Sequence, residues 1–267
     1  MNPLYAIVLG LVQGLAEFLP ISSTAHLTLI GKLLGLIDAE HPEAWTAFIA
    51  VMQLGTLAAV IAYFMKDIIA MAQALIADVR LKILFTDVRA YSPMSRLAIV
   101  VIVGTLPVAL LGLWAHTLIE GSLTKSTYVI IAGLVVLAVL LLIAEKAARH
   151  LRTIDQLTIK DALIIGLAQA LALVPGSSRS GTTITAGLFL GLTRQAAARF
   201  SFLLSIPAVA ASGIYEMMKI DTHVFTLGAG NLVIATVASA ISGYAAIHWL
   251  LRFLQNRTTM VFVWYRF

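Results

Sequence analysis

Two short polar segments with the same skeleton interrupt the apolar sequence, one in each half of the chain. The first covers residues 13–26 and the second covers residues 169–183. Each contains a glutamine, a proline and a pair of serines, in that order. With a one-residue gap allowed, the matching residues are Gln13 and Gln169, Pro20 and Pro175, and Ser22-Ser23 and Ser177-Ser178. Polar and ionisable groups within membrane-type sequence are costly and usually functional, so this duplicated segment is the candidate active site.

The first segment carries groups that suit acid–base or nucleophilic chemistry. Glu17 follows Gln13 by four residues, so the two side chains share one helical face. His26 lies beyond Pro20 and can reach back toward that face. A carboxylate, an imidazole and serine hydroxyls suit proton transfer and attack on an electrophile. The attacking group is left open between Ser23, His26 and an activated water. The alternative interpretation is a set of helix caps beside a buried histidine.

Glu17 also suits a hard divalent cation. Magnesium is usually held by one or two carboxylates together with substrate phosphates. We therefore expect a divalent cation, Mg²⁺ or Ca²⁺, at Glu17 with Gln13 nearby.

The second segment has the composition of an anion-binding loop. Its glycines let the backbone approach a ligand, and a helix beginning near Ser180 would direct free N–H groups at the loop. Arg179 can bind two phosphate oxygens at once. The alternative is that the serines cap the helix and the arginine reaches the membrane interface. A nucleotide-binding P-loop is excluded, because Thr182 replaces its lysine and no strand precedes it. The predicted phosphate-binding residues are Ser22, Ser177, Ser178, Arg179, Ser180 and Thr183.

The composition is that of an integral membrane protein. The 267 residues are 60% hydrophobic and 12% charged, with a mean hydropathy of +0.97, whereas soluble domains carry about 25% charge. The net charge is +5, but the basic residues gather in connections between apolar stretches, which favours cytoplasmic loops over nucleic-acid binding. Uncharged stretches long enough to span a bilayer as helices lie at 44–65, 97–116, 126–144, 200–215 and 223–251.

The predicted fold class is an all-α polytopic membrane protein built as an inverted-topology repeat. It forms a single integral membrane domain over residues 1–267, with repeat 1 at about 1–146 and repeat 2 at about 158–267. We predict re-entrant helix-loop-helix hairpins at about 1–36 and 159–192, an amphipathic connector near 67–90, and spans near 43–65, 96–115, 126–146, 195–217 and 226–253. Three spans separate the hairpins, and because three is odd the hairpins enter from opposite faces. Their loops should then meet near the bilayer midplane.

With these motifs, the chain resembles the bacterial undecaprenyl-pyrophosphate phosphatase family from Leu9 to Arg266. The family's first motif, [Glu/Gln]-x-x-x-Glu with a later Ser-Ser-Thr-x-His, fits residues 13–26. Its second, Pro-Gly-x-Ser-Arg-Ser-x-x-Thr, fits residues 175–183. Gln13 takes the amide option of the first motif. The family normally continues into a full helix after the Tyr-Arg-Phe found at 265–267, so the last helix is expected to be truncated here.

The resemblance implies removal of the terminal phosphate from a C55 isoprenyl pyrophosphate, which regenerates the lipid carrier for cell-wall synthesis. It also implies bacitracin resistance, a location in the bacterial inner membrane, and an active site that opens to the periplasm. The expected partners are the lipid substrate and bilayer lipids. A homodimer with a second copy of the chain is possible, and nucleic acid is not an expected partner. The expected catalytic residues are Glu17, Ser23, His26 and Arg179.

The competing function class is transport. Inverted repeats with broken helices are the architecture of secondary carriers, so a lipid-phosphate flippase or a secondary transporter would fit the same pattern. A flippase would expose its site to each side in turn and break no bond. Release of phosphate by the purified protein separates the two classes.

Overall fold

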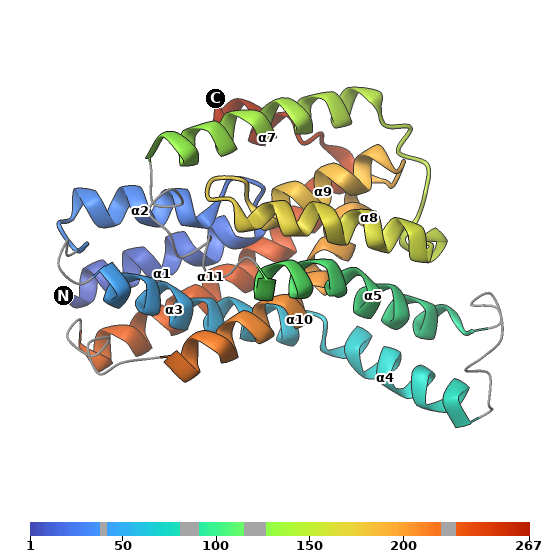
Figure 1. Cartoon of the computed structure of the whole chain (residues 1–267), viewed down its shortest axis with the longest axis horizontal. Helices are drawn as coiled ribbons and strands as arrows, with labels where there is room; N and C mark the ends of the chain where they lie inside the picture. Colours follow the sequence, from blue (N-terminus) through green and yellow to red (C-terminus); the bar gives the residue numbers. More distant parts are fainter. Residues whose placement is uncertain (38–41, 81–90, 115–126, 220–227) are drawn as a thin grey trace.

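The computed structural model of the chain describes residues 1–37, 42–80, 91–114, 127–219 and 228–267 (Figure 1). Within these residues the fold consists of eleven α-helices and contains no β-strand. The helices are α1 (Pro3–Phe18), α2 (Ser23–Leu33), α3 (Pro42–Tyr63), α4 (Met65–Arg80), α5 (Pro93–Trp114), α7 (Thr127–Ala147), α8 (Ile159–Ala170), α9 (Arg179–Phe189), α10 (Arg194–Lys219), α11 (Ala229–Asn256) and α12 (Met260–Arg266). Two short 3₁₀ turns are η4 (Ile154–Gln156) and η5 (Leu171–Leu173).

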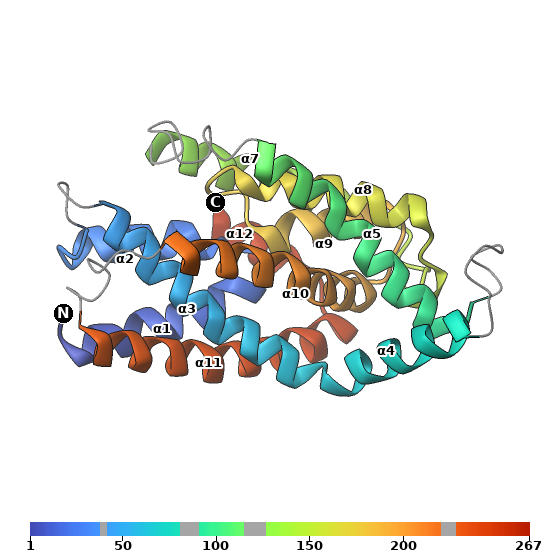
Figure 2. The same cartoon turned by 60° about the horizontal axis from the view of Figure 1, so that its bottom comes forward.

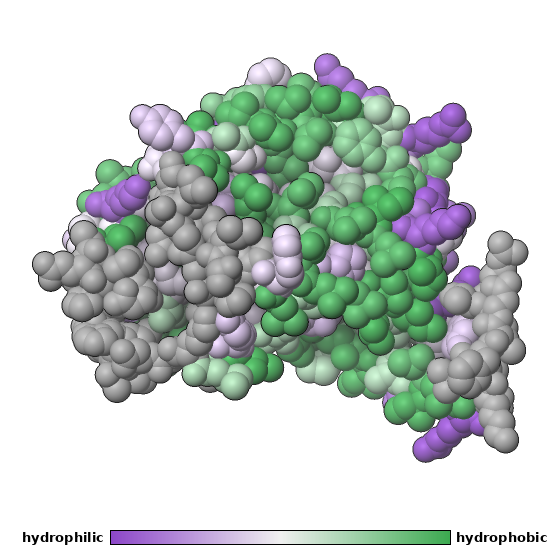
Figure 3. All heavy atoms as spheres, in the orientation of Figure 1, coloured by the Kyte–Doolittle hydropathy of each residue, from purple (hydrophilic) through white to green (hydrophobic). Residues whose placement is uncertain are grey.

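Five of the described helices are long and apolar enough to cross a membrane: α3, α5, α7, α10 and α11. Their bounds agree with the five predicted spans to within a few residues, which confirms the all-α, multi-span class. The predicted connector near 67–90 begins as α4 and ends as a helix at Arg80; residues 81–90 lie outside the described part. Large hydrophobic side chains are exposed along α5, α7 and α11. Figure 3 shows hydrophobic side chains over the middle of one face, with hydrophilic side chains gathered toward the end where α8 begins.

Each polar segment forms a hairpin of two helices, α1–α2 and α8–α9. The turn of each hairpin ends in a serine that caps the following helix through its hydroxyl, Ser22 for α2 and Ser178 for α9. Both serines have a positive φ, 74° and 66° respectively, a conformation uncommon outside glycine and often found at functional sites. The two turns therefore share an unusual backbone conformation as well as similar residues.

These caps correct the predicted alignment of the two segments. Ser22 matches Ser178 at the same offset that relates Gln13 to Gln169, so no gap is needed. The match of Ser22-Ser23 with Ser177-Ser178 is wrong by one residue, because the two prolines do not occupy equivalent positions in the two turns. The structure instead pairs Ser23 with Arg179 as the first residue of each second helix.

The hairpins pack against helices of the opposite half of the chain. Helix α1 lies along α11, and α8 lies along α5 (Figures 1 and 2). Both contacts are close enough to require glycine: a Cβ at Gly10 would lie 2.3 Å from the backbone oxygen of Ala235, and one at Gly166 would lie 2.2 Å from that of Gly104. Gly10 and Gly166 again have the offset that relates the two glutamines. The same contact thus occurs once in each half.

Ion pairs between partly exposed arginines and buried carboxylates join helix ends where α8 begins. Arg194 at the start of α10 pairs with Glu145 near the end of α7. Arg152, in the connection after α7, pairs with Asp161 on α8 at 2.5 Å. Burial raises the pKa of the Asp161 carboxyl, but hydrogen bonds from Arg152 and Thr158 outweigh it and hold that pKa below its usual value.

Two clusters of buried side chains form the core. The larger joins α5, α8, α9 and α10 to the second half of α11, with fully buried Phe200, Phe202 and Ile184. The smaller joins the first half of α1 to α2, α3 and the start of α11, around Phe48 and Met52. Phe18 and Ile21 at the first turn belong to the larger cluster, and α1 also contacts α9.

We predict that Gly10→Ala and Gly166→Ala each destabilise the protein by about 1–3 kcal/mol, because the new methyl group meets backbone that cannot yield. Gly112→Ala on α5 is the matched control: a Cβ there meets no atom of the described residues within 4 Å, and alanine favours helix by up to about 1 kcal/mol. Thermal unfolding of the three variants in one detergent measures the difference. Equal midpoints for all three would contradict the close packing.

Candidate active site

The carboxylate of Glu17 lies where the two hairpins meet. The side chain is buried, and its oxygens accept three hydrogen bonds. Oε2 accepts from Gln13 Nε2 at 3.2 Å and from Ser23 Oγ at 2.8 Å. Oε1 accepts from Arg179 in an ion pair of 3.0 Å. One carboxylate therefore connects residues of both predicted segments, which are more than 150 positions apart in the sequence.

The first turns of α2 and α9 converge on this carboxylate. Ser23 and Arg179 are the first residues of the two helices, and both contact Glu17. The serine caps satisfy the N–H groups of Ala25 and Gly181. The N–H groups of the first two residues in each helix have no internal helical partner. Two helix N-termini, each with partial positive charge, thus meet at one place and favour an anion there.

Arg179 is held by two hydrogen-bond partners and still has N–H donors unpaired among the described residues. Beside the Glu17 contact, NH1 donates to the carbonyl oxygen of Ser201 at 3.3 Å, and the guanidinium lies 5.9 Å from the centre of the Phe18 ring. Its Nε has no partner among the described residues. The side chain is only partly buried. A planar group so fixed can receive phosphate oxygens without much reorganisation.

The remaining predicted phosphate ligands differ in what their hydroxyls do. Ser178 is partly exposed, and its Oγ caps Gly181 and lies 3.2 Å from Ser180 Oγ. Ser180 is buried and donates across to the carbonyl of Leu19, in the first hairpin. Thr183 is buried, donates to the carbonyl of Arg179 and lies 2.6 Å from Ser201 Oγ. The hydroxyls of Ser180 and Thr183 thus hold the turn together, and a contact of either with phosphate stays a prediction.

Ser22 and Ser177 are buried in the two turns. The hydroxyl of Ser22 caps α2, at 3.4 Å from Ala25 N. The backbone of Ser177 helps to close its own turn, since its N–H donates to Val174. Their predicted role as phosphate ligands is not tested by these contacts.

His26 lies at the edge of the site, on α2. Its Nδ1 is 2.7 Å from the carbonyl oxygen of Ser22, and its Nε2 is 2.8 Å from the hydroxyl of Tyr265. A carbonyl only accepts, so Nδ1 carries the hydrogen, and a neutral ring then accepts from Tyr265 at Nε2. The two rings stack with centres 5.6 Å apart. No hydrogen bond joins His26 to Glu17 in the described part of the chain, so the predicted acid–base pair is not in direct contact.

Arg266 is a residue that sequence reasoning missed. It is buried on α12 and donates to backbone carbonyls of both turns, to Pro20 at 2.5 Å and to Ser177 at 3.4 Å. A third bond reaches Leu134 on α7 at 3.4 Å. The signal was present: an arginine in the apolar segment 258–267 is an ionisable group in membrane-type sequence.

The side-chain oxygens of Glu17 and Gln13 are suitable ligands for a divalent cation that also binds the substrate. Gln13 Oε1 is buried and has no partner in the described residues, so one amide oxygen is free beside the carboxylate. No group of three His, Asp or Glu side chains that could hold a metal alone occurs within the described ranges. Two protein oxygens and a substrate phosphate match the usual arrangement for Mg²⁺.

Comparison with known proteins decides the family. The family model described as bacitracin resistance protein BacA matches residues 6–267, which include both hairpins and Arg266. The chain belongs to this family. Among curated relatives, an undecaprenyl-diphosphatase of Syntrophobacter fumaroxidans is 54% identical over 267 residues, which is all of this chain and 94% of the relative.

Two further relatives carry the same name. An undecaprenyl-diphosphatase of Myxococcus xanthus is 51% identical over all of this chain and 86% of its own length. One of Chloroherpeton thalassium is 46% identical over all of this chain and 93% of its length. This BacA-family chain thus matches, along its own whole length, proteins named undecaprenyl-diphosphatase.

We predict that Arg266→Gln lowers the free energy of unfolding by about 1–3 kcal/mol for each turn carbonyl left unpaired. Arg257→Gln is the control, because Arg257 is exposed and follows α11 outside both turns. Thermal unfolding of both purified variants measures the difference. If Arg266→Gln unfolded at the midpoint of the control, Arg266 would not hold the two turns together.

Proposed function

We propose that this chain hydrolyses undecaprenyl pyrophosphate to undecaprenyl phosphate and inorganic phosphate. The observation that carries the proposal is the contact of one buried carboxylate, Glu17, with a hydroxyl at 2.8 Å and a guanidinium at 3.0 Å. A hydroxyl within hydrogen-bond reach of a base is the arrangement of an activated nucleophile. The names of the relatives, undecaprenyl-diphosphatase, support the same substrate.

In the proposed reaction Ser23 is the nucleophile. Its Oγ attacks the terminal phosphorus while its proton passes to Glu17 Oε2. The bond from that phosphorus to the bridging oxygen breaks, and its electron pair leaves with undecaprenyl phosphate. Water then hydrolyses the phosphoserine, which restores Ser23 and releases inorganic phosphate. Of the three candidates for attack, Ser23 is favoured because its hydroxyl already donates to a carboxylate.

Arg179 and the helix N-termini stabilise the charge of the phosphoryl group. Phosphoryl transfer depends mainly on positioning and on charge stabilisation. When Glu17 takes the proton, its ion pair with Arg179 weakens, and the guanidinium becomes free to bind the phosphate oxygens. Ser178, partly exposed beside Arg179, is the predicted ligand best placed to add a hydroxyl.

His26 is proposed to act in the second step. Its ring is partly exposed and its Nδ1–H is fixed by Ser22, so Nε2 is the basic nitrogen. Accepting a proton from water there requires that Tyr265 turn its hydroxyl away. As the alternative to its role as the base, Glu17 would hold a divalent cation, Mg²⁺ or Ca²⁺, together with Gln13 Oε1, and the cation would neutralise charge on the pyrophosphate.

We further infer that the hairpins are re-entrant halves of an inverted repeat. Supporting this, α1 begins at one end of the molecule and α8 at the opposite end (Figure 1), and α1–α11 and α8–α5 repeat one glycine contact. Basic residues of the described connections and helix ends collect where α8 begins, which the positive-inside rule assigns to the cytoplasm. The first hairpin, and with it the active site, would then open to the periplasm. These residues are Lys66, Arg80, Arg96, Lys146, Arg149, Arg152, Lys160, Arg194 and Arg257.

Single cysteines test this orientation, because the chain contains none of its own. We expect Ser122→Cys, between α5 and α7, to react with an impermeant maleimide on intact cells. Asp155→Cys, exposed in the connection between α7 and α8, should react only after permeabilisation. Labelling of both positions from the same face would exclude the inverted repeat.

Phosphate release from the purified protein in detergent tests the enzymatic function against the flippase alternative. We expect release from undecaprenyl pyrophosphate by the wild type, and a loss of about a thousandfold or more in Ser23→Ala, as for other activated nucleophiles. The matched control is Thr24→Ala, which removes the next hydroxyl on α2. That side chain is exposed and has no hydrogen bond to a described residue.

The outcomes separate the alternatives. Near-normal turnover in Thr24→Ala beside inactive Ser23→Ala supports the proposed nucleophile. Substantial turnover in Ser23→Ala would mean that water attacks directly. If the wild type released no phosphate, with or without Mg²⁺ or Ca²⁺, the proposed hydrolase function would be excluded and transport would be the better explanation.

A further inference from the structure

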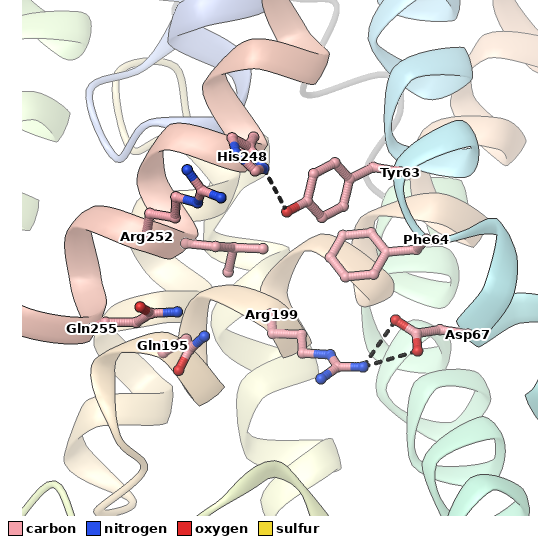
Figure 4. Close-up of a pocket in the computed structure, with 9 residues that line it drawn as sticks. Tyr63, Phe64, Asp67, Gln195, Arg199, His248, Arg252 and Gln255 are labelled. Carbon is pink, nitrogen blue, oxygen red and sulfur yellow. Dashed lines mark hydrogen bonds and ion pairs between the residues drawn. The ribbon is translucent and has the colours of Figure 1, made fainter.

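A second polar pocket lies at the end of the molecule where the basic connections gather. Its volume is about 330 Å³. Figure 4 shows that its side chains come from the junction of α3 and α4, from the first turns of α10 and from the last turns of α11. None of these residues belongs to the site around Glu17. The lining consists of Tyr63, Phe64, Asp67, Gln195, Arg199, His248, Leu251, Arg252 and Gln255.

The pocket carries more positive charge than its one carboxylate balances. A single nitrogen of Arg199 bridges both oxygens of Asp67 at 2.9 Å. The Nε of Arg199 is buried and has no partner in the described chain. Arg252 on α11 is exposed and forms no ion pair or hydrogen bond with any described residue. Among the described residues, the charge of Arg252 is therefore not balanced by a carboxylate, and Arg199 has N–H donors that are still unpaired.

The neutral side chains complete a set of donors beside an apolar wall. Gln195 and Gln255 add two amides to the lining (Figure 4). The hydroxyl of Tyr63 lies 3.3 Å from His248 Nδ1. Phe64 and Leu251 are buried and supply hydrocarbon surface. Guanidiniums suit phosphate oxygens, and the apolar wall suits the hydrocarbon to which a lipid phosphate is attached.

Aromatic rings separate this pocket from the candidate active site. Phe64, in the pocket wall, packs on Phe202 with ring centres 6.5 Å apart. Phe202 packs edge-on against Phe18 at 5.3 Å, and Phe18 carries Arg179 on its face. The pocket is thus a site of its own, because an apolar layer lies between its cations and the Glu17 carboxylate.

We propose that this pocket binds the phosphate group of a membrane lipid, with Arg252 and Arg199 as its cationic ligands. Basic pockets between membrane helices on the cytoplasmic side are known to take anionic lipid headgroups. The basic residues around this one place it on that side. The ligand chemistry is a phosphate mono- or diester, as in a bilayer phospholipid, and inorganic phosphate shares its charge.

Native mass spectrometry of the full chain in detergent tests the proposal, with titrations of phosphatidylglycerol, phosphatidylcholine and inorganic phosphate. We expect phosphatidylglycerol to bind, and Arg252→Ala to weaken it about tenfold or more, as expected for loss of a charged hydrogen bond. Arg257→Ala is the control, because it removes the same charge five residues further along, just beyond the end of α11 and outside the pocket lining. Its affinity should match the wild type.

The comparison among ligands identifies the occupant. If phosphatidylglycerol binds more tightly than inorganic phosphate and Arg252→Ala weakens both, the natural ligand is a lipid. If the two bind equally, the pocket binds free phosphate through the same arginines and the lipid proposal is wrong. Equal losses in Arg252→Ala and Arg257→Ala, or no binding of any phosphate, would overturn the proposal. Phosphate release by Arg252→Ala at the wild-type rate would show that the variant is folded. Failure of the proposed hydrolase would leave these binding results unchanged.

Discussion

The buried carboxylate of Glu17 is the constraint on which the arrangement of the two hairpins depends. A carboxylate removed from water is strongly unfavourable unless it is paired and hydrogen-bonded. Gln13 and Ser23, in the same hairpin, supply two hydrogen bonds, but the positive charge comes from Arg179 in the other half of the chain. Neither hairpin can bury its own polar groups alone. Forming the site and joining the two halves are therefore the same event.

Two other contacts bring the turns to the required distance. Gly10 lets α1 approach the backbone of α11, and Gly166 lets α8 approach the backbone of α5. Small residues at such contacts are a common way for membrane helices to associate. Arg266 then binds a carbonyl of each turn. Since carbonyl oxygens only accept, the guanidinium is a compact source of several donors in a place that excludes water. The positive φ values of Ser22 and Ser178 persist inside this frame.

The charges of the molecule are thus divided between two regions with an apolar layer between them. Around Glu17, Arg179 balances the single carboxylate, while the second guanidinium, that of Arg266, donates to the backbone carbonyls of the two turns. Around Arg199 and Arg252 a permanent positive excess remains. The first arrangement suits a substrate that must leave after reaction, and the second suits a ligand that stays bound.

The sequence by itself determined the all-α, multi-span class, the spans and the two polar segments, because apolar length and ionisable groups in a membrane follow from transfer free energies alone. It also singled out Glu17, Ser23 and Arg179. It did not give the register of the repeat, since the prolines suggested a gap that the caps at Ser22 and Ser178 remove. Nor did it place Arg266 in the site or separate His26 from Glu17. Those facts depend on how helices from distant parts of the chain pack, and only the tertiary structure brings their side chains within bonding distance.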